Sequence, residues 1–181
     1  MNRILLMILA TALSAPAAVL GQGSTPDAQV KRGEYIVSTS GCHDCHTPFK
    51  IGPNGPEPDM TRALSGHPHD FIIKAPVALS EPWIAATAST MTAVSGPWGV
   101  SFSANLTPDK ETGVLQDFTE QQFIQTLRTG RHLGQGRPIL PPMPWPVYGK
   151  MTDEDLKAVF AYLRQIPAVK NKVPDPLPPA K

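Results

Sequence analysis

Apolar residues recur at helical spacing in three segments of this chain, and the first of these segments follows Thr25. Pro26 or Asp27 lies near the start of the segment, where proline and acidic residues are favoured, and the pattern continues to about Ser40. Its apolar residues are Val30, Tyr35, Ile36 and Val37. We therefore predict a first helix over about residues 26–40.

The second segment has capping residues at both of its ends. The hydroxyl of Thr119 can cap a helix while Gln122 reaches back from the third helical position, which is the capping-box arrangement. Gly130 is a natural C-cap residue. The apolar stripe between them is Phe123, Ile124 and Leu127. A second helix between Thr119 and Gly130 follows from this pattern.

The third segment begins at Thr152, and three acidic residues follow it where they favour the positive end of a helix dipole. Its apolar residues keep the i, i+3, i+4, i+7 spacing of one buried face: Leu156, Val159, Phe160 and Leu163. Pro167 is expected to end this helix. No alternating pattern is long enough to predict a sheet, although short strand pairings within residues 70–106 stay open.

Proline is unusually frequent, with 21 prolines in 181 residues, which is more than twice the usual ~5%. Proline interrupts both helices and sheets, so long irregular connections are expected. They fall in residues 47–117 and 136–149. A third proline-rich run, residues 174–179, predicts a disordered or extended tail.

The N-terminus has the pattern of a secretory signal peptide. A short basic start is followed by an apolar run over residues 4–12 and by small residues up to Gly21. The apolar run is too short to span a bilayer, and no later stretch is apolar enough to do so. We place cleavage after Gly21, with Ala17 and Ala18 as alternatives. The predicted organisation is a cleaved segment 1–21 and one domain over residues 22–181, with an irregular insertion at 47–104 and an extended tail at 170–181.

Charge narrows the choice of partners. Cleavage after Gly21 removes Arg3 as the single charged side chain, so the remaining chain has 15 basic residues (16 minus 1) and 15 acidic residues. A neutral chain argues against nucleic acid as a partner, which would call for a basic surface. The signal peptide places the protein in an oxidising compartment, most simply a bacterial periplasm.

The most specific motif is the C-x-x-C-H run formed by Cys42, Cys45 and His46, which is typical of c-type haem attachment. Two thiols at this spacing can each form a thioether with one vinyl group of a porphyrin, and the adjacent imidazole can bind the iron as the proximal ligand. A structural disulfide, a thioredoxin-like redox pair and half of a zinc site are the alternatives. The redox pair would need a βαβ context, and a zinc site would need further Cys or His ligands, whereas the chain has two cysteines in all.

The order of helix, C-x-x-C-H, loop, middle helix, proline-flanked methionine and final helix resembles a class I cytochrome c. This resemblance implies an all-α cytochrome c fold, with about three main helices around one covalently bound haem c and long Pro/Gly-rich loops. It also implies close crossing of the first and last helices. The candidates for that crossing are Gly33, Tyr35, Phe160 and Tyr162.

In this family the sixth iron ligand is a methionine in the loop before the last helix, which here corresponds to Met143. Prolines on both sides restrict its backbone, so a weak thioether ligand can be fixed with little loss of entropy. The alternative is that Met143 packs on the haem edge without binding iron. Met60 and Met91 are expected to fill gaps in the insertion, and Met151 to pack in the core or at the surface.

Other side chains could serve the same cofactor in lesser roles. His67, His69 and His132 are expected at the surface or beside a haem propionate. The basic residues Arg128, Arg131, Arg137 and Lys150 form either a solvated face or a propionate-binding group. Trp98 and Trp145 could donate an indole N–H to a propionate or pack against the porphyrin.

Three further motifs resemble the cytochrome subunits that accompany periplasmic dehydrogenases: residues 32–35, 105–109 and 128–131. The chain departs from the three-haem members of that group because it has one C-x-x-C-H and no membrane anchor. The resemblance implies a periplasmic one-electron carrier, not an enzyme in its own right. It would pass electrons from a dehydrogenase towards a terminal oxidase or a membrane cytochrome. A haem enzyme or ligand sensor with an open or displaceable sixth position is the alternative, and a subunit that docks a dehydrogenase through residues 47–104 is a third possibility.

Overall fold

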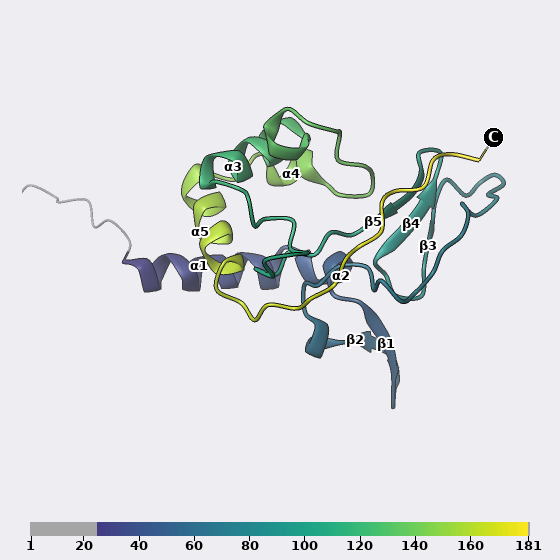
Figure 1. Cartoon of the computed structure of the whole chain (residues 1–181), viewed down its shortest axis with the longest axis horizontal. Coiled ribbons are helices and arrows are strands. Elements are labelled where there is room, and N and C mark those ends of the chain that lie inside the picture. The colour runs from purple at the N-terminus through teal and green to yellow at the C-terminus, as the bar shows by residue number, and fades with distance from the viewer. Residues whose placement is uncertain (1–24, 181) are drawn as a thin grey trace, which may run out of the picture.

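The computed structural model describes residues 25–180, and the predicted signal peptide, residues 1–21, lies outside them. This part of the chain contains five α-helices and two small antiparallel sheets (Figure 1). The expected all-α fold is therefore correct only in part. The helices are α1 (Pro26–Thr39), α2 (Cys42–His46), α3 (Glu120–Thr129), α4 (Trp145–Tyr148) and α5 (Asp153–Leu163). The strands are β1 (Phe49–Gly52), β2 (Gly55–Pro58), β3 (Ala86–Thr87), β4 (Ala93–Gly96) and β5 (Gly99–Phe102), with 3-10 turns at Met60–Arg62 (η1) and His132–Gly134 (η2).

The three predicted helices are α1, α3 and α5, and local capping explains where each begins. The hydroxyl of Thr25 accepts a hydrogen bond from the backbone N–H of Ala28 at the start of α1. The capping box predicted at Thr119 and Gln122 is present, and Gly130 ends α3 in the left-handed conformation. Helix α5 ends at Leu163 rather than continuing to Pro167.

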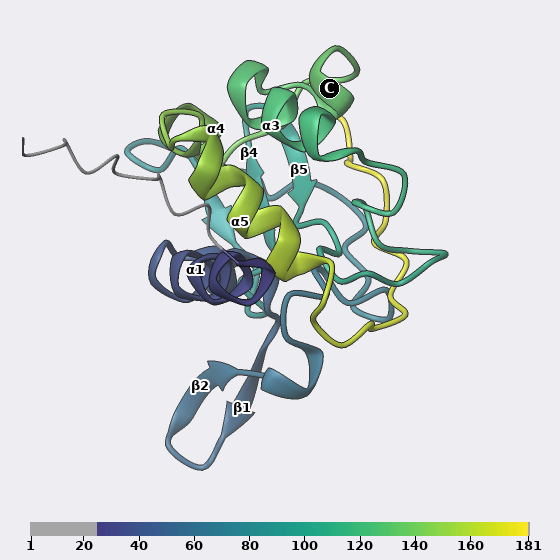
Figure 2. The ribbon, with the colours of Figure 1, turned by 90° about the vertical axis from the view of Figure 1, so that its left-hand side faces the viewer.

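Helices α1 and α5 cross in close contact, as Figure 2 shows by viewing α1 along its axis with α5 across it. Gly33 makes this approach possible, because a Cβ at this position would overlap the backbone of Ala158 and the Cβ of Tyr162. Arg32 and Asp155 add an ion pair between the two helices at 2.8 Å. Of the other residues predicted at the crossing, Tyr35 is 60% exposed, and Phe160 packs against Phe123 of α3 with ring centroids 5.3 Å apart.

Both small sheets lie within residues 47–104, which were expected to be irregular. Strands β1 and β2 form a hairpin that projects from the helices (Figure 2). Strand β4 pairs with β3 on one side and with β5 on the other. None of these strands exceeds four residues, so none could show an alternating pattern of useful length.

The C-terminal tail lies extended against the rest of the structure. Leu177 and Val100 exchange both of their backbone hydrogen bonds, each at 3.0 Å, so the tail continues the edge of β5. Upstream, the buried side chain of Asn171 donates to the carbonyl oxygens of Ser65 and His67 at 2.7 and 2.8 Å. The tail is thus attached at two points, and residues 172–176 lie between them.

Over residues 25–180, no helix has the length and apolar character needed to cross a membrane.

Candidate functional site

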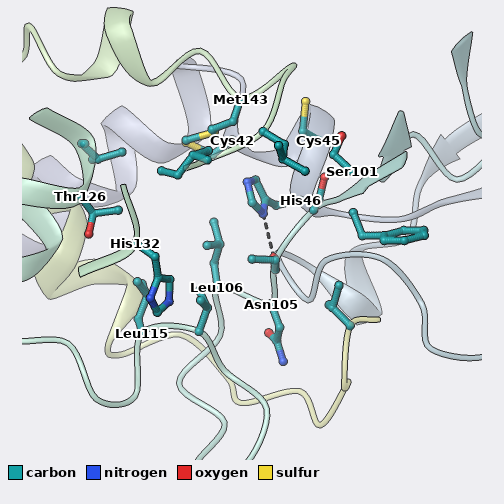
Figure 3. A pocket seen from close by; sticks show the side chains of 18 of the residues that line it. Cys42, Cys45, His46, Ser101, Asn105, Leu106, Leu115, Thr126, His132 and Met143 are labelled. Carbon is teal, nitrogen blue, oxygen red and sulfur yellow. Dashed lines mark hydrogen bonds between the residues drawn. The ribbon is translucent and has the colours of Figure 1, made fainter. Parts of the chain in front are cut away.

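The C-x-x-C-H motif forms the short helix α2 directly after α1. Gly41 makes the turn between the two helices in the left-handed conformation, with φ of 74°, which glycine adopts without strain. Cys42, Cys45 and His46 all line one cavity of about 410 Å³ (Figure 3). This volume falls in the ~300–1,000 Å³ range of pockets that hold cofactors and other small ligands.

The walls of this cavity are largely apolar and come from every part of the helical core. Helices α1, α3 and α5 each contribute, together with residues 101–106, the loop at 137–144 and the tail at 172–176. The buried apolar side chains among the lining residues are Ile36, Leu115, Phe118, Phe123, Leu127, Leu156, Val159 and Leu163. Such a lining suits a large planar apolar group.

His46 is oriented by a hydrogen bond that fixes its tautomer. Its Nδ1 lies 2.8 Å from the carbonyl oxygen of Ala104, drawn as the dashed line in Figure 3. A carbonyl oxygen can only accept, so Nδ1 carries the proton and Nε2 keeps its lone pair. Burial lowers the pKa of His46, which favours the neutral imidazole that binds metals. An imidazole oriented through its second nitrogen in this way is the usual arrangement of a metal-ligating histidine.

The two cysteine thiols are free rather than joined in a disulfide. Burial raises the pKa of Cys42 to about 11, and burial also raises the pKa of Cys45. A redox-active C-x-x-C pair has a lowered thiol pKa, so these values argue against that alternative. Among the described residues there is also no group of three or more Cys, His, Asp or Glu side chains of the kind that would hold a zinc ion.

Met143 is half-buried and lines the same cavity as the C-x-x-C-H motif (Figure 3). Met151 lines the cavity as well and packs against the core. Met60 and Met91 are 61% and 40% exposed and do not line it. The structure thus brings two methionines, rather than one, to the cavity wall.

Of the three histidines expected at the surface or beside a propionate, His67 departs from the expectation, whereas His69 is exposed as expected. His67 is fully buried rather than superficial, because its ring nitrogens meet the hydroxyl of Thr92 at 3.0 Å and the carbonyl oxygen of Phe71 at 2.9 Å. His69 faces the side-chain oxygen of Asn171 at 3.3 Å. His132 alone of the three lines the cavity, where its ring meets the ring of Phe118 edge-on with centroids 5.1 Å apart.

Of the basic and indole side chains proposed as propionate partners, Arg137 is the one that lines the cavity. Arg128 is engaged with Asp153 and with the carbonyl oxygen of Gly149. Trp145 lies against Gly130, in the space that a Cβ there would occupy. Lys172 of the tail lines the cavity too, although no local sequence pattern predicted this.

These observations define the class of site. Paired protonated thiols, a neutral imidazole with one free nitrogen and an apolar cavity fit the donor set of a c-type haem. In these features the site resembles that of c-type cytochromes.

Comparison with known proteins agrees with this class, although no protein-family model matches the chain. The chain is 29% identical over 173 residues to the cytochrome c subunit of a quinone-dependent alcohol dehydrogenase from Gluconobacter oxydans, covering 92% of this chain and 29% of the relative. It is 31% identical over 162 residues to the gluconate 2-dehydrogenase cytochrome c subunit of Pantoea cypripedii, covering 90% and 28%. It is 28% identical over 153 residues to the fructose dehydrogenase cytochrome subunit of Gluconobacter japonicus, covering 81% and 24%.

The chain spans less than a third of the length of these relatives. The resemblance predicted from the sequence is confirmed: the chain is similar to the cytochrome c subunits of dehydrogenases, and these relatives support electron transfer by a haem-bearing protein.

Proposed function

We propose that this protein is an exported one-electron carrier with a single haem c. In this proposal Cys42 and Cys45 form the two thioethers, His46 is the proximal iron ligand and Met143 is the distal ligand. The observation that carries the proposal is that all four side chains line one apolar cavity.

The haem supplies the one-electron redox change, and the residues of this chain supply its position and surroundings. The carbonyl oxygen of Ala104 accepts a hydrogen bond from the Nδ1–H of His46, which would leave Nε2 available for iron. Cys42 and Cys45 would hold the haem, each adding its S–H across one vinyl double bond to give a thioether. The apolar walls exclude water, so little solvent has to reorganise when the charge on the site changes.

The names of the relatives suggest which proteins exchange electrons with this one. Because the relatives are named as subunits of dehydrogenases, we propose that a dehydrogenase donates electrons to this protein. A terminal oxidase or a membrane cytochrome would accept them, in the periplasm where the signal peptide at residues 1–21 would deliver the chain. The single domain of residues 22–181 would then act as a non-catalytic electron-transfer subunit or as a free carrier.

The test of the distal ligand is Met143→Ala in the haem-bearing protein. A methionine sulfur bound to ferric iron gives a weak long-wavelength charge-transfer absorption, which this substitution should abolish while haem content stays nearly unchanged. Ferrous Met143→Ala should also bind carbon monoxide readily, whereas the wild type should resist it. Met151→Ala is the matched control because Met151 also lines the cavity, and Met60→Ala and Met91→Ala are exposed controls.

Retention of the band in Met143→Ala, with its loss in Met151→Ala, would move the distal ligand to Met151. A wild type that has no such band and binds carbon monoxide at once would favour the haem enzyme or ligand sensor.

A further inference from the structure

One short segment, residues 101–104, contacts both the C-x-x-C-H helix and the loop that carries Met143. At one end, the carbonyl oxygen of Ala104 accepts the hydrogen bond from His46. At the other end, the hydroxyl of Ser101 donates to the carbonyl oxygen of Pro141 at 2.5 Å. Three residues of extended chain span at most ~10 Å, so both contacts lie on one short stretch of backbone, whose residues line the cavity. Figure 3 labels Ser101 and draws the hydrogen bond of His46.

The loop around Met143 has few other polar attachments. Residues 140–144 include three prolines, which have no N–H to donate. The remaining hydrogen bonds of this loop go to its own near neighbours, such as the one from Trp145 N–H to the Met143 carbonyl oxygen. Among the residues that the structure describes, the bond from Ser101 is the one hydrogen bond that ties residues 140–144 to a distant part of the chain.

Ser101 is itself firmly placed. Its residue is 9% exposed, so water competes little for its hydroxyl. Strand β5 pairs with β4 on one edge, and the neighbouring Val100 is bonded to Leu177 of the tail on the other. The hydroxyl has one proton, and the carbonyl oxygen of Pro141 is its closer acceptor, since the carbonyl oxygen of Val94 lies at 3.2 Å.

We propose that Ser101 is a positioning residue for the sixth iron ligand. It acts through Pro141, holding the proline-rich loop so that Met143 stays at the cavity wall. This inference rests on the proposed function, in which Met143 binds the iron. The insertion at residues 47–104 thereby has a specific role. Its last residues include both strand β5, which carries Ser101, and Ala104, whose carbonyl oxygen accepts the hydrogen bond from His46.

The experiment compares Ser101→Ala with Ser101→Thr, which keeps a hydroxyl, and with Ser95→Ala. Ser95 is a matched control because it is a buried serine of the same sheet, 5% exposed, whose hydroxyl oxygen accepts from Val77 N–H and does not touch the loop. Imidazole is titrated into each ferric haem protein, and its displacement of the methionine is followed by loss of the long-wavelength sulfur-to-iron band. The reduction potential is measured in parallel, and thermal unfolding monitors the fold.

Loss of one net hydrogen bond corresponds to about a two- to tenfold change in an equilibrium, so imidazole should bind Ser101→Ala about two- to tenfold more tightly than the wild type. The potential should fall, because the ferrous form loses more when methionine ligation weakens. Ser101→Thr should return both values towards the wild type. Ser95→Ala should leave both unchanged even where it lowers the unfolding temperature.

A wild type with the band, together with imidazole affinity in Ser101→Ala equal to that in Ser95→Ala, would overturn the inference and leave the proposed function intact. A wild type without the band would overturn the His/Met proposal and the inference with it.

Discussion

Asn171→Ala should release the C-terminal tail from the cavity wall. Asn171 is 1% exposed and its side chain makes three short contacts with the insertion: it donates to the carbonyl oxygens of Ser65 and His67 and accepts from the N–H of His69, at 2.7, 2.8 and 3.0 Å. Alanine leaves all three backbone groups without this partner. At about 1 kcal/mol net for each bond, the substitution should lower the free energy of unfolding by about 3 kcal/mol. That is a large fraction of the ~5–15 kcal/mol of a typical domain.

The assay is guanidinium unfolding of the haem-bearing protein, with amide hydrogen exchange at Leu177 as a local reporter, because this N–H donates to the carbonyl oxygen of Val100. If the tail opens locally, exchange at Leu177 should accelerate about a hundredfold. Asn54→Ala, at an exposed turn, is the matched control and should change stability by less than about 0.5 kcal/mol. A loss in Asn171→Ala no greater than in Asn54→Ala would refute the reasoning.

Three further outcomes are expected. Gly33→Val should lower the free energy of unfolding by about 1–3 kcal/mol in thermal denaturation, because a side chain there overlaps Ala158 and forces α1 from α5; wild-type stability would contradict this packing. The hydrogen bond from Arg32 lowers the pKa of Asp155 in the folded protein. The ion pair therefore stabilises the fold above the pKa of ~4 that the carboxyl group has in the unfolded chain, and this stabilisation is lost as pH falls through the lower pKa of the folded state. Asp155→Asn should therefore flatten the acid side of a stability-against-pH curve by no more than about 1 kcal/mol, and an unchanged curve would count against the pair. Deleting residues 1–21 should leave the chain without covalent haem in a cell that attaches haem outside its inner membrane, and abundant covalent product would contradict the signal peptide.

The helices could be predicted because their signals are local. Thr119 and Gln122 lie three residues apart and cap the same helix turn, and Gly130 ends that helix. The strands were harder to predict: the hairpin of β1 and β2 was missed, and the pairings within residues 70–106 were left open. Strand β3 has two residues, and its pairing with β4 depends on how the chain between them turns back. A pattern so short carries no period that a sequence can display.

Burial of single residues was also beyond local reasoning. His67 is beside a proline in a polar stretch, but its partner Thr92 lies 25 residues further along. Tyr35 shares the first helix with Gly33, yet its side chain is on the solvent side. Which face of a helix meets its neighbour is decided by the whole packing arrangement.

The candidate site likewise combines residues that a local motif reveals with residues that only the tertiary structure brings to it. Cys42, Cys45 and His46 lie within five consecutive residues, so a motif finds them, and Met143 stood out through its flanking prolines. The carbonyl oxygen that orients His46 belongs to Ala104, 58 residues away, and any residue type could supply it. Tail residues such as Lys172 likewise reach the cavity through tertiary contacts alone.

The central claim is that Cys42 and Cys45 carry one covalent haem, and the mass of their peptide tests it most directly. The protein should be produced with its N-terminal segment in cells that attach haem outside the inner membrane, and then extracted with acid and organic solvent and digested with trypsin. The peptide Gly33–Lys50, which contains both cysteines, should carry the added mass of one haem, and the intact protein should show the same single addition. Recovery of this peptide with two free thiols or an internal disulfide, from protein that was exported and folded, would contradict the account.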